Sequence, residues 1–274
     1  MYEHKEEIKE QIRNLQYKPS PVKRVEIPKE NGKMRKLGIP TVTDRVIQQA
    51  MVQVLDPIFD RQFTQNSFGF RKGHSPEMAV IKALEYFNDG YDWIVDIDLQ
   101  TFFDNVNQDS IIRRTIKDGR VVSLIRKYLV SGVMINGVVQ PTKVGTPQEG
   151  DLSPLLSNVM LNELDKELEK RELRFVRYAD DCLIMVKSEK AANRVTKTIT
   201  SYIENKLGLI VNVEKSKIAR PNQIKYLGFV FYNKKETWRP KPHLKSVQKF
   251  EEKLKDITGR SNAMSIDEKI IKLN

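Results

Sequence analysis

Two adjacent aspartates, Asp180 and Asp181, stand between two apolar segments at residues 174–187. The flanking segments are rich in β-branched and aromatic residues, so they predict a β-hairpin with both carboxylates at its tip. Ordinary hairpin turns use Asn-Gly or Asp-Gly, and two neighbouring like charges contribute nothing to a core. The pattern therefore favours a functional site over a simple structural turn.

A second acidic segment lies upstream, in a strand predicted over residues 93–99. Because side chains alternate along a strand, Asp96 and Asp98 share one face and the apolar residues share the other. If this strand pairs with the hairpin, three or four carboxylates converge. Oxygen ligands without histidine are typical of Mg²⁺ or Mn²⁺ sites and not of zinc sites. Two such ions about 3.5–4 Å apart suit in-line phosphoryl transfer.

The charge balance indicates a polyanionic partner. The 274 residues include 47 Lys and Arg against 36 Asp and Glu, a net charge of +11. The excess is +3 in residues 1–90, +5 in 91–235 and +3 in 236–274, as a long groove would need. The single cysteine, Cys182, excludes a disulfide scaffold and a multi-cysteine zinc site. No apolar run reaches the roughly 18–20 residues of a membrane span, so we expect a cytoplasmic protein with no membrane partner.

The hydrophobic periodicity predicts helices and antiparallel hairpins in irregular alternation, which is the α+β class. Expected helices cover residues 3–16, 44–59, 76–88, 107–117, 120–130, 153–171, 189–207 and 245–254. Expected strands cover residues 23–27, 34–39, 93–99, 174–187, 209–213 and 226–232, with a further hairpin around 136–137.

Seven sequence blocks, in order, resemble the reverse transcriptases encoded by group II introns, the maturase family. They are residues 27–50, 67–71, 98–104, 145–158, 178–181 (Tyr-Ala-Asp-Asp), 207–216 and 226–229. The resemblance implies a right-hand polymerase fold with fingers and palm, an antiparallel palm sheet flanked by helices, and a thumb that is largely missing.

The same resemblance divides the chain into an N-terminal extension helix at 1–20, fingers at 21–90, palm at 91–235 and the start of a truncated thumb at 236–274. Fingers-side helices at about 107–130 lie within the palm segment. Because a short thumb leaves the primer–template groove with an incomplete wall, we expect salt-sensitive synthesis of low processivity.

The resemblance also assigns the metal ligands. Asp98, Asp180 and Asp181 are the implied catalytic, metal-binding carboxylates, with the backbone carbonyl of Leu99 as a further ligand, and Asp96 is a supporting residue. The implied cofactor is a pair of Mg²⁺ ions, for which Mn²⁺ is a substitute.

The nucleotide site is implied in the same way. Lys29 and Arg35 resemble the fingers cations that clamp the triphosphate, a role that suits a point charge and a planar fork. Phe103 occupies the position of the aromatic ring that leaves no room for a ribose 2′-hydroxyl. Gln148 resembles the glutamine beside the nascent base pair, with Leu99 near the same nucleotide. Lys215 resembles a lysine near the nucleotide phosphates, although a solvated surface lysine explains it equally well.

Two neighbouring positions need comment. Many family members carry two glycines after the glutamine, whereas Glu149 stands first here. Arg71 is expected to support the template or the fingers.

The resemblance implies that the protein is the RNA-directed DNA polymerase of a retroelement, which adds dNTPs to a DNA primer on an RNA template. It also implies that the protein binds group II intron RNA as a maturase. The expected setting is a bacterial cytoplasmic ribonucleoprotein, and the protein could also form a homodimer. An RNA-binding splicing cofactor without polymerase activity is the first alternative, but it has no need for the three aspartates with Phe103 and Gln148. A retron-like bacterial reverse transcriptase is another, and an RNA-dependent RNA polymerase is opposed by Phe103.

Overall fold

The computed structural model describes residues 4–28, 32, 34–100, 109–135, 138–140, 150–259 and 264–273, with only the backbone for residues 35, 100 and 109–111. Their helices and antiparallel strands confirm the predicted α+β class. Among these residues, no helix combines the length and the apolar character needed to cross a lipid bilayer.

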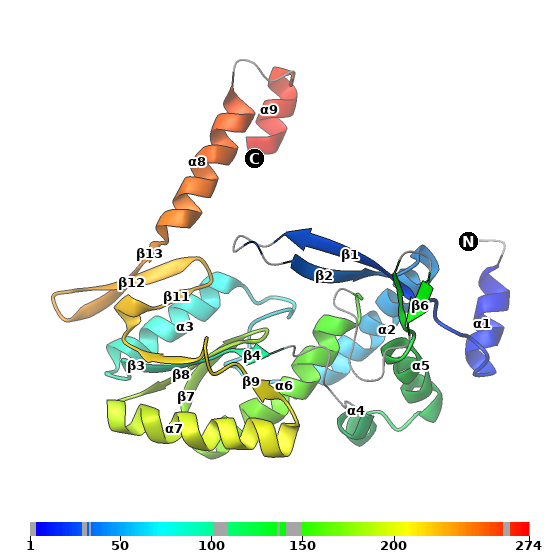
Figure 1. Cartoon of the computed structure of the whole chain (residues 1–274), viewed down its shortest axis with the longest axis horizontal. Coiled ribbons are helices and arrows are strands. Elements are labelled where there is room, and N and C mark those ends of the chain that lie inside the picture. The colour runs from blue at the N-terminus through cyan, green and yellow to red at the C-terminus, as the bar shows by residue number, and fades with distance from the viewer. Residues whose placement is uncertain are drawn as a thin grey trace.

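Helices form wherever the 3.6-residue periodicity predicted them, and a further helix over residues 266–273 was not predicted (Figure 1). They are α1 (Lys5–Arg13), α2 (Val42–Asp60), α3 (Pro76–Asn88), α4 (Asp109–Thr115), α5 (Gly119–Leu129), α6 (Ser153–Lys170), α7 (Glu189–Tyr202), α8 (Leu244–Thr258) and α9 (Ile266–Leu273). Helix α7 continues as a π-helical turn, Ile203–Leu207, and ends at Gly208, whose φ of 66° is the left-handed conformation that glycine adopts without strain.

The strands include several that the periodicity did not predict. They are β1 (Val22–Pro28), β2 (Met34–Ile39), β3 (Trp93–Ile97), β4 (Leu99–Gln100), β5 (Val133–Ile135), β6 (Val138–Gln140), β7 (Arg174–Tyr178), β8 (Asp181–Val186), β9 (Ile210–Val211), β10 (Lys217–Ala219), β11 (Lys225–Tyr226), β12 (Phe229–Lys234) and β13 (Thr237–Pro242). Strands β10 and β13 were not predicted. The single strand expected over 226–232 is wrong, because a turn at Leu227-Gly228, both with positive φ, breaks it into the antiparallel pair β11 and β12. The β12–β13 pair is a hairpin that runs across the expected palm–thumb boundary at residue 235.

The central sheet has the strand order β10-β3-β8-β7, and all its pairs are antiparallel. One face packs on α6 and α7 through a core that includes Val95, Ile97 and Ile184. The other face packs on α3 and the β11–β13 sheet through Ile94 and Leu183, among others. Figure 1 shows α7 and α3 on opposite sides of this sheet. The sheet is therefore densely packed on both faces, which leaves its strands little room to move.

A second sheet has the order β2-β1-β5-β6. The β1–β2 hairpin is antiparallel as predicted, whereas β1 pairs in parallel with β5, Val22 opposite Val133. A third core, formed by α2, α4, α5 and α6, joins this part to the central sheet. At the other end of the chain, α8 and α9 contact one another and project away from the rest (Figure 1).

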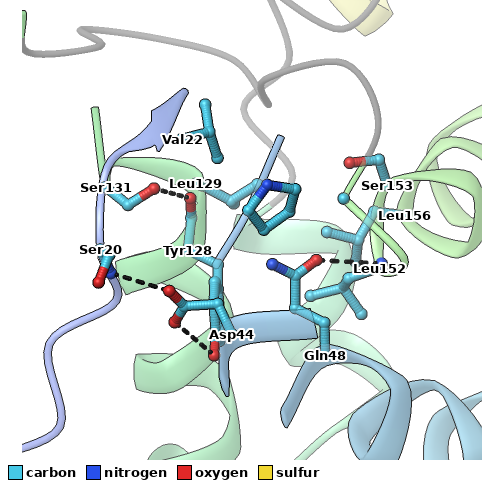
Figure 2. A pocket seen from close by; sticks show the side chains of 12 residues that line it. Ser20, Val22, Asp44, Gln48, Tyr128, Leu129, Ser131, Leu152, Ser153 and Leu156 are labelled. Carbon is cyan, nitrogen blue, oxygen red and sulfur yellow. Dashed lines mark hydrogen bonds between the residues drawn. The ribbon is translucent and has the colours of Figure 1, made fainter. Parts of the chain in front are cut away.

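The buried carboxylate of Asp44 ties the N-terminal segment to α2 and α5 (Figure 2). Its oxygens accept hydrogen bonds from the hydroxyls of Tyr17 (2.7 Å), Thr41 (2.6 Å) and Tyr128 (3.3 Å) and from the Ser20 amide (3.2 Å). Thr41 is also the N-cap of α2, since its hydroxyl accepts from the Asp44 amide. Four donors satisfy a charge that would otherwise be costly to bury.

Candidate active site

The register of the central sheet brings the two acidic segments together. Strands β3 and β8 pair with Ile97 opposite Cys182, so the next step along both strands places Asp98 beside Asp181. Ile97 and Cys182 point into the core with α6 and α7, and side chains alternate along strands. Asp98 and Asp181 therefore lie on the other face of the sheet, together with Asp96. The condition set by the sequence, that the 93–99 strand pairs with the hairpin, is therefore met by β3 and β8.

A two-residue turn, Ala179-Asp180, joins β7 to β8, and Tyr178 and Asp181 form the closing pair. Ala179 has a φ of 57°, a left-handed conformation that is uncommon outside glycine. The turn rests on the backbone of Gly69, where a Cβ atom would lie 2.2 Å from the Ala179 nitrogen. Only glycine fits at residue 69 without moving the turn that carries Asp180.

The carboxylates influence one another. The pKa of Asp181 is raised to about 6, first because surrounding protein displaces water and then because Asp180, Asp96 and Asp98 repel its charge. Burial also raises the pKa of Asp96, while Lys217 opposes the rise. This coupling indicates a compact acidic cluster at one end of the sheet.

The end of β3 is fixed in position by the segment that follows β9. The Asp98 amide donates to the Ser216 hydroxyl at 3.1 Å, and the Asp98 carbonyl accepts from the Asn212 amide at 2.8 Å. The Lys215 ammonium lies 3.4 Å from Asp98 Oδ2. A lysine predicted near the nucleotide therefore stands beside one of the predicted metal ligands.

The donor set has the chemistry of a hard-cation site. Asp98, Asp180 and Asp181 offer only oxygens, which suit Mg²⁺ or Mn²⁺. The neighbouring thiol of Cys182 points into the opposite core, and burial raises its pKa far above the ordinary value, so it remains a protonated thiol. Over the described part of the chain, no three His, Cys, Asp or Glu side chains are close enough to hold one ion as they stand.

Several predicted nucleotide-site residues lie outside the described residues, namely Lys29, Phe103, Gln148 and the neighbouring Glu149. The backbone of Arg35 lies in β2 opposite Ile27. Leu99 lies in β4, paired with Val211 of β9. The roles of all these residues in nucleotide or metal binding remain predictions.

Arg71 supports the fold from inside. Its guanidinium pairs with Asp60 at 2.6 Å and donates to the carbonyls of Thr64 and Ser67 at 2.7 and 2.6 Å. The side chain is 4% exposed, so it fixes the loop that leads to Gly69 and has little surface to offer a template.

Two groups of supporting residues were not identified from the sequence. Arg177 forms a buried network behind the turn with Asn158 and Asp165 of α6. The sequence does contain a pattern that indicates such a network. Polar residues recur at helical spacing on the inner face of α6, namely Asn158, Asn162 and Asp165.

The second group centres on Gln48 of α2, whose side chain Figure 2 shows reaching the start of α6. Its Oε1 accepts from the Leu152 amide at 3.4 Å. A Cβ atom on Gly150 would lie 2.5 Å from the same oxygen. Gln48 thus fixes the backbone just after the segment that carries Gln148.

Comparisons with known proteins agree with this geometry. Residues 27–231 match the reverse transcriptase (RNA-dependent DNA polymerase) family. Protein YkfC of Escherichia coli is 32% identical over 265 residues, covering 82% of this chain and 68% of YkfC. The group II intron-encoded protein LtrA of Lactococcus lactis is 32% identical over 296 residues, covering 82% of this chain and 49% of LtrA. The chain thus spans about two thirds of one relative and half of the other.

A solved structure confirms the fold. Apo telomerase from Candida tropicalis, truncated from its C-terminal domain, superposes with a TM-score of 0.61 at 13% identity, covering 82% of this chain and 55% of that one. At that identity the likeness concerns the fold alone, and it agrees with the predicted fingers and palm. The family itself is shown by the match over residues 27–231 and by the relatives at 32% identity: the chain belongs to the reverse transcriptase family, with group II intron-encoded proteins among its relatives.

Proposed function

We propose that this chain catalyses RNA-directed DNA synthesis. In the reaction, the 3′-hydroxyl oxygen of a DNA primer attacks the α-phosphorus of a dNTP that is paired with an RNA template. A new phosphodiester bond forms, the bond between the α- and β-phosphates breaks, and pyrophosphate leaves while the hydroxyl proton is lost.

The observation that carries the proposal is the register of β3 and β8. It aligns Asp98 with Asp181 on one face of a sheet that is buried on both sides, next to Asp180 on the turn. Acidic side chains are rarely clustered without a cation to bind. The rigid sheet beneath supplies the fixed geometry that in-line transfer requires.

Asp98, Asp180 and Asp181, with the Leu99 carbonyl, would hold two Mg²⁺ ions, or Mn²⁺ in their place. Bound there, such ions stabilise the attacking and leaving oxygens of the transfer. The protein residues keep the carboxylates at the end of the sheet, and the raised pKa of Asp181 makes its proton a competitor for cation binding near and below pH 6.

The nucleotide-binding roles complete the proposal. Lys29 and Arg35 clamp the triphosphate, Phe103 excludes the ribose 2′-hydroxyl, and Gln148 lies beside the new base pair. Lys215 approaches the nucleotide phosphates, and its position 3.4 Å from Asp98 supports that role.

The partners we propose are an RNA template, a DNA primer, dNTPs and a group II intron RNA that the protein binds as a maturase, in a bacterial cytoplasmic ribonucleoprotein. The net charge of +11 supports a polyanionic partner. A homodimer is a further prediction, and the exposed side chains of Leu244 and Phe250 on α8 offer an apolar surface for it. Sedimentation at several protein concentrations tests the dimer.

Primer extension on poly(rA)/oligo(dT) with Mg²⁺ tests the activity. The chain should extend the primer, and the double variant Asp180→Asn, Asp181→Asn should not. Asp89→Asn removes an exposed carboxylate at the opposite end of the central sheet, beside the start of β3, and should extend normally. Binding of intron RNA without any extension by the wild type would favour the splicing-cofactor alternative. Synthesis by the double variant would exclude these carboxylates from the chemistry.

A further inference from the structure

Arg177 is a fully buried cation that lies directly behind the turn carrying Asp180. It occupies β7 one residue before Tyr178, and its side chain is 0% exposed. A charge in that position is costly unless every polar atom finds a partner. The contacts of the guanidinium therefore determine what an arginine contributes at this position.

Each of the five guanidinium N–H groups has an acceptor. Two of them form a bidentate pair with Asp165 of α6, at 2.8 and 2.6 Å. One donates to Ser67 Oγ at 2.7 Å and one to Asn158 Oδ1 at 2.9 Å. The fifth donates to the carbonyl of Ala179, inside the turn itself, at 2.8 Å.

The same network holds the opposite side of the turn. The Asn158 amide group donates to the Gly69 carbonyl at 2.8 Å, and Gly69 is the residue on which the Ala179 backbone rests. The backbone of Arg177 adds two bonds to this loop, since its amide donates to Asn66 and its carbonyl accepts from Phe68. The turn is thus fixed by Arg177 from inside and by the Gly69 loop from beneath.

Stability alone is a poor reason for this arrangement. A buried ion pair can often be replaced by apolar residues of similar volume with no loss of stability. An apolar pair cannot, however, donate to the Ala179 carbonyl, and Ala179 adopts a left-handed conformation that the surroundings must maintain. The bond to Ala179 is the contact that only a hydrogen-bond donor can make.

We propose that Arg177 is a positioning residue, whose guanidinium, oriented by Asp165, holds the Ala179 carbonyl and so fixes the carboxylates of Asp180 and Asp181 in their productive positions. This role rests on the proposed function of the two aspartates in nucleotidyl transfer. Arg177 itself is buried and contacts neither nucleotide nor template.

The test replaces the pair by apolar residues, Arg177→Met with Asp165→Leu, in the full chain. Thermal unfolding, single-turnover primer extension and hydrogen exchange of the segment 176–183 are measured on the same samples. We expect faster exchange in this segment and a melting temperature below the wild type, because the Ser67, Asn158 and Ala179 acceptors lose their donor. The rate constant at saturating dNTP should fall by about 10- to 100-fold, the range expected for a misplacement near 1 Å. The KM for dNTP should change by less than about threefold, because the nucleotide contacts are intact.

Two further variants make the result decisive. Leu168→Ala opens a cavity in the core under α6, away from the turn, and should lower the melting temperature while the rate constant stays near the wild type. Arg177→Lys keeps a charge beside Asp165 but not the planar fork, and should lose rate like the double variant. If the double variant fails to fold, Arg177→Lys decides the question.

A rate constant within about twofold of the wild type in the folded double variant, or in Arg177→Lys, would overturn the proposal. Unchanged hydrogen exchange at residues 176–183 would overturn it as well. If the wild type shows no synthesis, the proposed function fails, and the exchange measurement still reports whether Arg177 holds the turn.

Discussion

Gly69→Ala should displace the catalytic turn, and the structure gives the size of the displacement. An added Cβ would lie 2.2 Å from the Ala179 nitrogen, 2.9 Å from the Tyr178 carbonyl carbon and 3.0 Å from Ala179 Cα, whereas ordinary contacts begin at 3.4 Å. The two backbones must therefore separate by about 1.2 Å at the closest pair. All three contacts are with backbone atoms, so no side chain can rotate away to relieve them.

Neither backbone is free to move. The Gly69 carbonyl is bonded to Asn158, and the carbonyl of Arg177, two residues before Ala179, accepts from the Phe68 amide. Overpacking of this kind costs about 1–3 kcal/mol of unfolding free energy. A shift near 1 Å in catalytic groups costs about 100-fold in rate, so we expect a loss of that order, caused by displacement of Asp180 and Asp181.

The assay is single-turnover extension of oligo(dT) on poly(rA) with saturating dTTP and Mg²⁺, together with thermal unfolding. Gly119→Ala is the matched control, since it adds the same methyl group at the first residue of α5, where no atom lies within 4 Å of the new Cβ. The control should keep the wild-type rate. A folded Gly69→Ala protein with a rate constant within about twofold of the wild type would refute the reasoning.

Three other outcomes are expected. In metal-free buffer, the pKa of Asp181 is about 6 in the folded protein and 3.8 in the unfolded chain, so the folded state holds this proton more tightly. The contribution of Asp181 to the free energy of unfolding is therefore complete below pH 3.8 and is lost as the pH rises through 6. Melting temperatures from pH 4 to 7 should show Asp181→Asn gaining on the wild type, and a constant difference would contradict the shift. Phe103→Ala should incorporate ribonucleotides, measured as the ratio of UTP to dUTP use on poly(rA)/oligo(dT), and an unchanged ratio would remove Phe103 from the sugar site. Asp44→Asn should lose about 1.5–3 kcal/mol of unfolding free energy, because four donors lose a charged acceptor; a melting curve like the wild type's would disprove that role for the carboxylate.

The parts of the fold that could be predicted from the sequence are those encoded locally. Alternation fixes which side chains of a strand share a face, and the faces expected for Val95 and Ile97 agree with the core that contains them. The turn at Asp180 could be predicted for the same reason, since two apolar strands flank it. Helix positions follow from periodicity, although α2 begins at Val42, after an N-cap at Thr41, and not at residue 44 as expected, because the Asp44 carboxylate is buried in tertiary contacts.

The parts that could not be predicted depend on partners distant in sequence. The three-residue strand β10 exists because it pairs with β3, and the parallel pairing of β1 with β5 joins residues more than a hundred positions apart. Arg177 was visible in the hairpin, but its role depends on Asp165 and Ser67, which come from α6 and from a loop after α2. These strand pairings and side-chain contacts depend on tertiary packing, which the intrinsic propensity of a short segment does not encode.

The residues that hold the turn oppose the electrostatic repulsion between the clustered carboxylates. Asp180 and Asp181 are adjacent on a tight turn, and Asp98 faces them from the next strand, so the turn is pushed away from the geometry that binds cations. A flexible turn would relax by separating the carboxylates. Here the left-handed Ala179, the bare backbone of Gly69 and the five-fold hydrogen-bonded Arg177 leave the turn little freedom to relax. A buried hydrogen-bond network behind the turn is therefore expected wherever several carboxylates are held close together in front of it. A change to either the network or the carboxylates should lower the rate of synthesis.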